Sequence, residues 1–162
     1  GAFGGAIADR LMKLRLITSS GEELILDRKN LAFSYRRSSL PEGSVIIEAA
    51  FALTKGDPLA IRRRILELLV QRNRSQPVEL RSCGSVFKNP PGDYAGRLIE
   101  AAGLKGFRRG DAQISPKHGN FIVNLGGAKA GDVLALIEVV KDRVKKEQGV
   151  ELELEVKVVG ED

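Results

Sequence analysis

The apolar and polar positions along this chain follow two periods, and each period predicts a type of element. The segment "LMKLRLIT" alternates with period 2, as a strand does, which groups Leu11 with Lys13 and places Met12 and Leu14 opposite. The turn "SSGEE" then leads back into a second strand, "ELILD". The segment "SVIIEAAFAL" is almost continuously apolar, which is typical of a strand in the centre of a sheet. Towards the end, "VELELEVKV" alternates strictly, so its valines and leucines share one face and its glutamates the other.

Helical spacing follows three aspartates. Asp57 precedes isoleucines and leucines at intervals of three and four, and Asp93 precedes a shorter stripe of the same kind. Asp132 precedes a third and longer stripe, which Gly149 closes. Because an aspartate side chain accepts hydrogen bonds from the free N–H groups of a first helical turn, all three are predicted to be N-caps.

Composition places the chain among ordinary globular proteins. It has 162 residues, with 43% apolar and 29% charged positions, enough for one domain or two small ones. We expect an α+β fold with a boundary at residues 77–78, because Pro77 cannot continue the helix before it. No apolar run of the sequence approaches the roughly 20 residues of a membrane-spanning helix, so no membrane contact is expected.

The content of cysteine and histidine limits the chemistry further. With the single cysteine Cys83 and the single histidine His118, we expect no metal site, and no internal disulfide can form. The shortage of cysteine suits a reducing compartment, so we expect a cytoplasmic protein, and we expect it to be a monomer.

The charge balance favours an anionic partner. The net charge is +5, and part of the excess lies in "IRRRILELLVQRNR" and "KGFRRGD". Nucleic acid, phosphate and a carboxylate substrate all suit such a balance. A solvated helix face is the simpler explanation of the first cluster.

The loop "GSVFKNP" gathers small and polar side chains. Gly84 permits a positive φ, which allows Ser85 to project into a cleft. Lys88 and Asn89 can bind an anion or a sugar. A lone serine is not a nucleophile without a base nearby, so spacing alone favours an ordinary structured loop.

The other candidates each have a simpler alternative on the surface. Arg36 beside Tyr35 can bind a carboxylate or phosphate with its planar fork. Glu153 and Glu155 face the same way on the predicted strand, and periodicity does not choose between them. His118 is more simply a satisfied histidine than a catalytic base, and the glycines of "GAFGG" are only a weak sign of a cofactor.

Five motifs nevertheless occur in order: "GAFGGAIAD", "FSYRRSSL", "GSVFKNPPGDYAGRLIEAAGLKG", "AQISPKHGNFIVN" and "LELEVKVVG". Together they resemble the UDP-N-acetylenolpyruvoylglucosamine reductase family, in its shorter type II branch, over essentially the whole chain. The resemblance implies a flavoprotein of peptidoglycan synthesis, in which NADPH reduces FAD and a hydride then passes to the enolpyruvyl group of a UDP-sugar. Protonation of the carbanionic species that results gives UDP-N-acetylmuramate.

The resemblance also implies roles for single residues. Ser85 matches the family's proton donor, Arg36 its catalytic arginine and Glu155 its catalytic carboxylate. A guanidinium suits negative charge that develops beside the substrate carboxylate, and a carboxylic acid shares that task only in its protonated form. The remaining matches are substrate-side or flavin-side positions: Tyr35, Lys88, Asn89 and His118 for the substrate, Gly4 and Gly5 for FAD.

Residues 1–77 then correspond to the second half of a FAD-binding α+β domain, and residues 78–162 to a small substrate-binding α+β domain. The glycine-rich segment that precedes "GAFGG" in the family is not in this sequence. We therefore expect this stretch alone to be a piece of the enzyme that is inactive and binds FAD weakly or not at all.

Two rival functions remain open at this stage. The chain could be a non-catalytic UDP-sugar-binding module, or a basic α+β module that binds nucleic acid. Against the second, the sequence has no aromatic pair of the RNP type and no helix-turn-helix pattern, so no nucleic-acid partner is expected.

Overall fold

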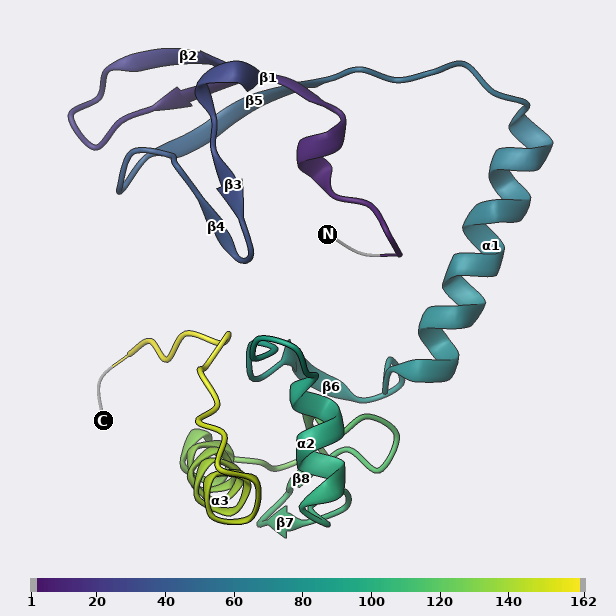
Figure 1. Ribbon diagram of the computed structural model, residues 1–162, viewed down its shortest axis with the longest axis vertical. Coiled ribbons are helices and arrows are strands. Elements are labelled where there is room, and N and C mark those ends of the chain that lie inside the picture. The colour runs from purple at the N-terminus through teal and green to yellow at the C-terminus, as the bar shows by residue number, and fades with distance from the viewer. Residues whose placement is uncertain (1–2, 161–162) are drawn as a thin grey trace. The chain divides into compact units, whose positions relative to one another are not determined.

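The computed structural model describes residues 3–160, and it has an α+β fold of two compact units, which meet in the chain between Ile65 and Leu66 (Figure 1). That division falls inside helix α1, Pro58–Ser75. The boundary of functional domains at residues 77–78 is a separate matter and stays a prediction. Among the described residues, no helix is both long and apolar enough to cross a membrane.

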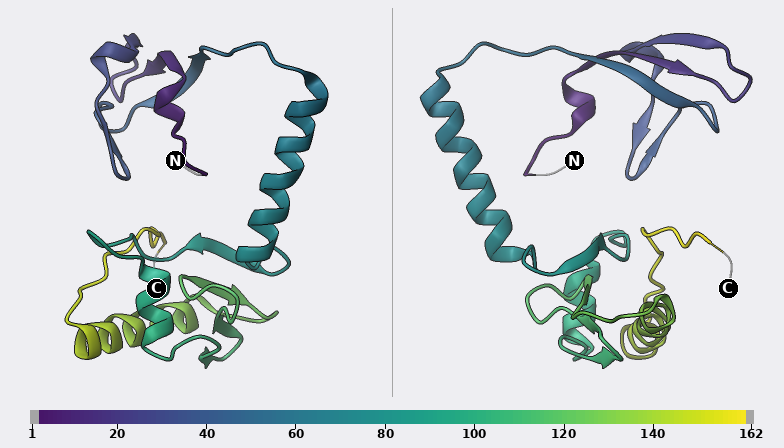
Figure 2. Two further views of the ribbon diagram at one scale, coloured as in Figure 1. Left: turned by 45° about the vertical axis from the view of Figure 1, so that its right-hand side comes forward. Right: turned by 180° about the vertical axis from the view of Figure 1, so that it is seen from behind.

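The first unit is built on a three-stranded antiparallel sheet. Strands β1, Leu11–Ile17, β2, Glu23–Asp27, and β5, Val45–Phe51, are arranged in the order β2-β1-β5. A small hairpin extends away from this sheet in both views of Figure 2. The smaller elements of the unit are η1, Ile7–Asp9, η2, Arg28–Asn30, β3, Phe33–Ser34, and β4, Arg37–Ser38.

The faces predicted for the side chains of β1 are wrong at the start of the strand. Leu11, Leu14 and Leu16 are buried, whereas Met12 is 54% exposed. The reason is a β-bulge between Leu11 and Lys13, where the pairing with β5 shifts by one residue. A bulge adds one residue to one strand only, and each added residue reverses the face of those that follow.

The predicted central place of "SVIIEAAFAL" is wrong as well. Within the described residues, β5 lies at an edge of the sheet and β1 lies in the middle. Most β5 side chains are exposed, including Val45 and Ile46. Apolar composition indicates that a strand tends to be covered, but hydrogen-bonding partners determine its order in a sheet.

Helix α1 begins as its capping signal predicts. The N–H of Ala60 donates to Asp57 Oδ2 at 2.9 Å, and the N–H of Leu59 donates to Asp57 Oδ1 at 3.4 Å. Pro58 occupies the first helical position, where a missing N–H has no cost.

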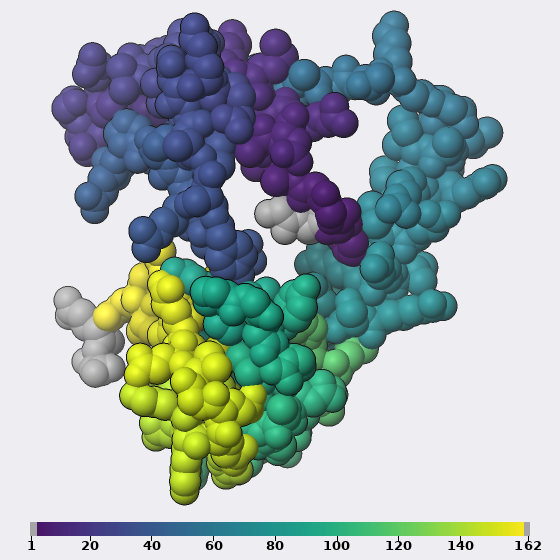
Figure 3. Space-filling model, viewed as in Figure 1, coloured from purple at the N-terminus to yellow at the C-terminus, as the bar shows by residue number. Residues whose placement is uncertain are grey.

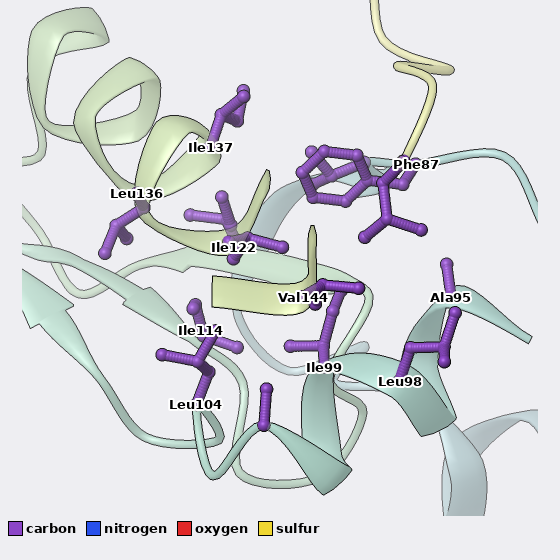
Figure 4. Close-up of a cluster of buried hydrophobic side chains, with 14 of the residues drawn as sticks. Phe87, Ala95, Leu98, Ile99, Leu104, Ile114, Ile122, Leu136, Ile137 and Val144 are labelled. Atoms are coloured by element: carbon purple, nitrogen blue, oxygen red, sulfur yellow. The ribbon is translucent and has the colours of Figure 1, made fainter. Parts of the chain in front are cut away.

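The second unit packs two helices against one face of a four-stranded antiparallel sheet, ordered β6-β9-β8-β7. Side chains from both helices and the sheet point toward one another in one buried cluster (Figure 4). Helices α2 and α3 contact each other in this unit. In the space-filling view the green and yellow-green segments that contain them adjoin (Figure 3). The bounds are β6, Arg81–Ser85, α2, Ala95–Ala101, β7, Arg108–Arg109, β8, Ala112–Ile114, β9, Phe121–Asn124, and α3, Ala130–Gln148.

Two of the predicted N-caps are displaced. The N-cap of α2 is Tyr94 rather than Asp93, and the N-cap of α3 is Lys129. Asp132 is the third residue of α3, and its Oδ2 accepts the N–H of Lys129 at 2.9 Å. A carboxylate can serve the first turn from either position, so the sequence signal does not distinguish them. Gly149 closes α3 with a left-handed φ of 69°, as predicted.

The segment 150–158 is not the strand that its alternation predicts. It forms one isolated bridge, between Phe87 and Leu154, although the predicted inward face is correct for Leu152, which is buried. Continuing that antiparallel pairing in one direction would bring in Pro90 and Pro91. Neither has an N–H to donate, so the ladder cannot extend in that direction.

Candidate functional site

Ser85 lies at the end of β6, where the strand is bent out of regular pairing. The pairing with β9 shifts between Ser82 and Ser85, and Gly84 has a φ of 82°. The positive φ that the sequence permits at Gly84 is therefore present. The bend directs Ser85 to a pocket within the second unit.

The pocket has a volume of about 420 Å³, and most of the residues that line it carry polar or charged side chains. Strand β6, the loop after it, helix α2 and the turn before β9 all contribute. Of the predicted site residues, Ser85, Asn89 and His118 are brought together here. The other lining residues are Tyr94, Gly96, Arg97, Glu100, Lys117, Gly119 and Asn120.

Two glycines allow helix α2 to approach the turn before β9. A Cβ on Gly119 would lie 2.8 Å from the carbonyl oxygen of Gly96, and a Cβ on Gly96 would lie 3.0 Å from Cε1 of His118. The first contact is with backbone, which cannot swing aside. The pocket wall therefore depends on the missing side chain at position 119.

We expect Gly119→Ala to lower the free energy of unfolding by about 1–3 kcal/mol, because it overpacks this contact. Urea denaturation measures the change. Gly131→Ala is the matched control, since Gly131 lies in α3 and a Cβ there would meet no atom within 4 Å, and it should be neutral or stabilising. Equal stability of Gly119→Ala and wild type would contradict the expectation.

His118 is held as a neutral ring. Its Nδ1 accepts the N–H of Asn120 at 3.2 Å, and its ring meets Phe121 edge-on with 4.9 Å between centroids. Burial is the main cause that lowers the pKa of His118, and nearby Lys105 lowers it further. Because Nδ1 is an acceptor, the ring proton is on Nε2, which can donate a hydrogen bond.

The lowered pKa of His118 predicts how stability depends on pH. The unfolded chain binds this proton more tightly than the folded chain, so stability falls as the pH drops below about 6.5 toward the folded pKa. Urea denaturation at several pH values from 7.5 to about 5 should show wild type losing more stability than His118→Asn. Carboxylates with lowered pKa, such as Asp93, titrate below this range. Parallel pH profiles of the two proteins would contradict the expectation.

The loop between Ser85 and α2 is tied down by its own polar groups. Asn89 Oδ1 accepts the N–H of Ala95, the first residue of α2, at 3.1 Å. Asp93 forms an ion pair with Arg97, which together with the N–H of Tyr94 lowers the pKa of Asp93 to about 2. Asn89 thus performs the capping task that the sequence assigned to Asp93.

The structure distinguishes the two glutamates that periodicity left equivalent. Glu153 forms an ion pair with Lys88, and the N–H of Lys88 donates to the Glu153 carbonyl at 2.8 Å. The N–H of Glu155 donates to the carbonyl of Val86, the residue after Ser85, at 2.9 Å. Neither Lys88 nor Glu155 is among the residues that line the 420 Å³ pocket.

Tyr35 and Arg36 form the turn of the β3–β4 hairpin in the first unit, since Ser34 pairs with Arg37. Arg36 has a φ of 57°, a left-handed conformation that is costly for a residue with a side chain. Its guanidinium lies over the Tyr35 ring, 4.9 Å from the centroid. Strain of this kind is frequent at functional positions.

Gly4 and Gly5 show an open backbone at the start of the first unit. Gly4 has a φ of 81°, which favours glycine, and a Cβ on either residue would meet no described atom within 4 Å. Internal packing therefore does not require glycine at these positions. An exposed backbone without side chains suits close approach of a bound group, so both residues fit a place beside a cofactor.

Asn120 is one of the pocket residues that the sequence did not reveal. It is 4% exposed, and its amide forms two hydrogen bonds with the backbone of Phe87. The available signal was slight: a polar residue between Gly119 and the apolar run of β9. Its two partners lie 33 positions away, and no local pattern predicts them.

The comparisons with known proteins agree on one family. Residues 76–159 match the sequence profile described as "UDP-N-acetylenolpyruvoylglucosamine reductase, C-terminal domain". Two relatives, from Alkalilimnicola ehrlichii and Syntrophus aciditrophicus, carry the name UDP-N-acetylenolpyruvoylglucosamine reductase and are each 48% identical to the chain. They match 99% and 100% of the chain, which spans 54% and 52% of their own lengths.

A solved structure gives the same relationship. The crystal structure of UDP-N-acetylenolpyruvylglucosamine reductase from Thermus caldophilus matches 96% of this chain at 43% identity, with a TM-score of 0.81. The match covers 56% of that protein. The chain thus spans about half the length of the reductases that it resembles.

Proposed function

Since the chain belongs to the UDP-N-acetylenolpyruvoylglucosamine reductase family, we propose that the protein that carries it reduces the enolpyruvyl ether of a UDP-sugar. The product would be UDP-N-acetylmuramate, a precursor of peptidoglycan, and NADPH would supply the electrons. The observation that carries this proposal is the position of Ser85 on a pocket lined mostly by residues with polar or charged side chains, within the family's matched region.

The proposal divides the chain by task. Residues 78–162 would bind the UDP-sugar, and Asn89 and His118 are candidates for its polar groups because they line the pocket with Ser85. Residues 1–77 would belong to the FAD-binding region, with the open backbone of Gly4 and Gly5 beside the cofactor. When bound, FAD supplies the hydride that the reaction requires.

Reduction of the enolpyruvyl double bond adds a hydride to one carbon and a proton to the next. We assign the proton to the Ser85 hydroxyl. A hydroxyl is a weak acid, but the carbanionic species is a strong base, and a donor held at the reacting carbon needs no encounter from solvent. Water then restores the proton to the serine oxygen.

Two further groups would act on the charge that develops beside the substrate carboxylate. Arg36 would stabilise this negative charge with its guanidinium, and we assign Glu155 as the carboxyl group that assists it. The 57° φ of Arg36 and the backbone hydrogen bond of Glu155 to Val86 support fixed positions for these residues. Lys88 and Tyr35 remain candidates for binding the substrate.

The test uses the protein that carries this chain, purified with FAD bound. NADPH should bleach the flavin absorbance, and UDP-N-acetylglucosamine enolpyruvate should restore it with formation of UDP-N-acetylmuramate, identified by mass spectrometry. A flavin that NADPH reduces but the enolpyruvyl substrate does not reoxidise would overturn the proposal.

A further inference from the structure

The amide of Asn120 joins two parts of the second unit that are far apart in the sequence. Its Oδ1 accepts the N–H of Phe87 at 2.9 Å, and its Nδ2 donates to the carbonyl oxygen of Phe87 at 2.8 Å. The carbonyl of Asn120 accepts the N–H of Val86, also at 2.9 Å. Three hydrogen bonds from one residue therefore hold the two positions that directly follow Ser85.

These bonds take the place of a regular β-ladder. The pairing of β6 with β9 ends at Ser85, which lies opposite Phe121, and the bulge at Gly84 interrupts it just before. Beyond Ser85 the chain must turn into the loop that leads to α2. Gly84 is permissive on one side of Ser85. On the other side, the Asn120 contacts hold the N–H groups of Val86 and Phe87, and the N–H of Glu155 donates to the Val86 carbonyl.

The hydrogen bonds between Asn120 and Phe87 are buried, so the loss of either one has a large effect. Val86 and Phe87 are each 1% exposed, so water cannot replace a lost partner of Phe87. A buried N–H or carbonyl left without a partner destabilises the folded state, because it has lost its hydration and gained nothing in return. The backbone would therefore move to find new partners, and Ser85 would move with it.

Asn120 is itself held in place from the other side. Its N–H donates to His118 Nδ1 at 3.2 Å, and the buried Ser115 Oγ accepts the N–H groups of Lys117 and His118 at 3.1 and 3.3 Å. The turn from Ser115 to Asn120 is thus a rigid support. Both polar atoms of the Asn120 amide form hydrogen bonds with Phe87. Asn120 is therefore a structural link to the segment that follows Ser85.

The geometry points to Asn120 as the positioning residue for Ser85, acting through the backbone of Val86 and Phe87. This inference rests on the proposed function, because it assumes that Ser85 donates the proton. It predicts that Asn120 affects the protonation step and leaves the NADPH half-reaction unchanged.

The test compares Asn120→Ala with wild type in the complete FAD-bound protein. We expect the rate of flavin reoxidation by the enolpyruvyl substrate to fall about 10- to 100-fold, as a displacement of about 1 Å would cause. The fall should appear in kcat, with KM changed much less, and flavin reduction by NADPH should keep its rate. Amide hydrogen exchange at Phe87 should become faster, which reports the loss of the clamp without any turnover.

A double-mutant cycle separates positioning from general destabilisation. In a Ser85→Ala background, Asn120→Ala should change the reoxidation rate by less than about threefold, because it acts only through the missing hydroxyl. Independent, multiplied effects of the two substitutions would overturn the inference. A wild-type flavin that the substrate does not reoxidise would instead overturn the proposed function.

Asn124, the last residue of β9, offers a matched control four positions further along the chain. Its Oδ1 accepts the N–H groups of Gly126 and Ala128 at 2.8 and 3.1 Å, so Asn124→Ala also breaks side-chain bonds to backbone. It should lower stability but leave the reoxidation rate unchanged. Should Asn120→Ala fail to fold, Asn120→Asp keeps the acceptor for the Phe87 N–H and replaces the donor to the Phe87 carbonyl with a carboxylate oxygen, which repels that carbonyl. A normal reoxidation rate in folded Asn120→Asp, with unchanged exchange at Phe87, would overturn the inference.

Discussion

Replacing Ser85 with alanine is expected to slow reoxidation of the reduced flavin by the enolpyruvyl substrate about 10²- to 10⁴-fold, the usual contribution of a positioned acid. Alanine fits where serine fits, and the φ of 82° belongs to Gly84, so the loop should keep its conformation. Reduction of the flavin by NADPH should proceed at the wild-type rate. Stopped-flow absorbance of the flavin measures each half-reaction separately.

Cys83 provides the control for this substitution. It lies two positions earlier on β6 and is exposed, so Cys83→Ala changes the same strand without removing a proposed proton donor. Its two half-reactions should match wild type. If Ser85→Ala behaves like Cys83→Ala in both half-reactions, another group donates the proton.

Replacing Arg36 with glycine is expected to lower kcat about 10²- to 10³-fold, the loss that follows removal of one donor to a developing anion. Stability should change in the opposite direction. Because Arg36 has a φ of 57°, glycine relieves a strain of about 1–2 kcal/mol in the hairpin turn. Steady-state kinetics together with urea denaturation would show a protein that is less active and at least as stable.

Arg37 is the matched control for Arg36. It is an exposed arginine in the same hairpin, on β4, and no role is proposed for it. Arg37→Ala should change kcat by less than about threefold, as expected for a surface charge. Similar losses from Arg36→Gly and Arg37→Ala would show that the hairpin contributes only general positive charge.

Much of the fold follows from local patterns. The strands β1 and β2 and the helices α1 and α3 lie where periodicity places them, because an amphipathic face repeats with the geometry of its own element. The cap at Asp57 and the left-handed Gly149 were also predictable, since their partners lie within one turn. Such contacts depend on neighbours in sequence.

The errors in the strands share one physical cause, which is a partner distant in sequence. The phase of β1 depends on a bulge against β5, and the edge position of β5 depends on which strand pairs on both sides of β1. The segment 150–158 alternates as a strand does, but it pairs with a loop whose prolines have no N–H to extend the ladder. Alternation says which side chains face inward and does not say which backbone is opposite.

The candidate site divides in the same way. By itself, the sequence determined the family, through ordered motifs whose match the comparisons confirm, and it identified Ser85 as a residue of interest. Only the tertiary structure placed Ser85, Asn89 and His118 around one pocket, paired Lys88 with Glu153, and showed Asn120 holding the backbone after Ser85. These contacts either join residues about 30 or more positions apart or depend on a turn. Periodicity along the chain does not predict which distant groups come into contact when the chain folds.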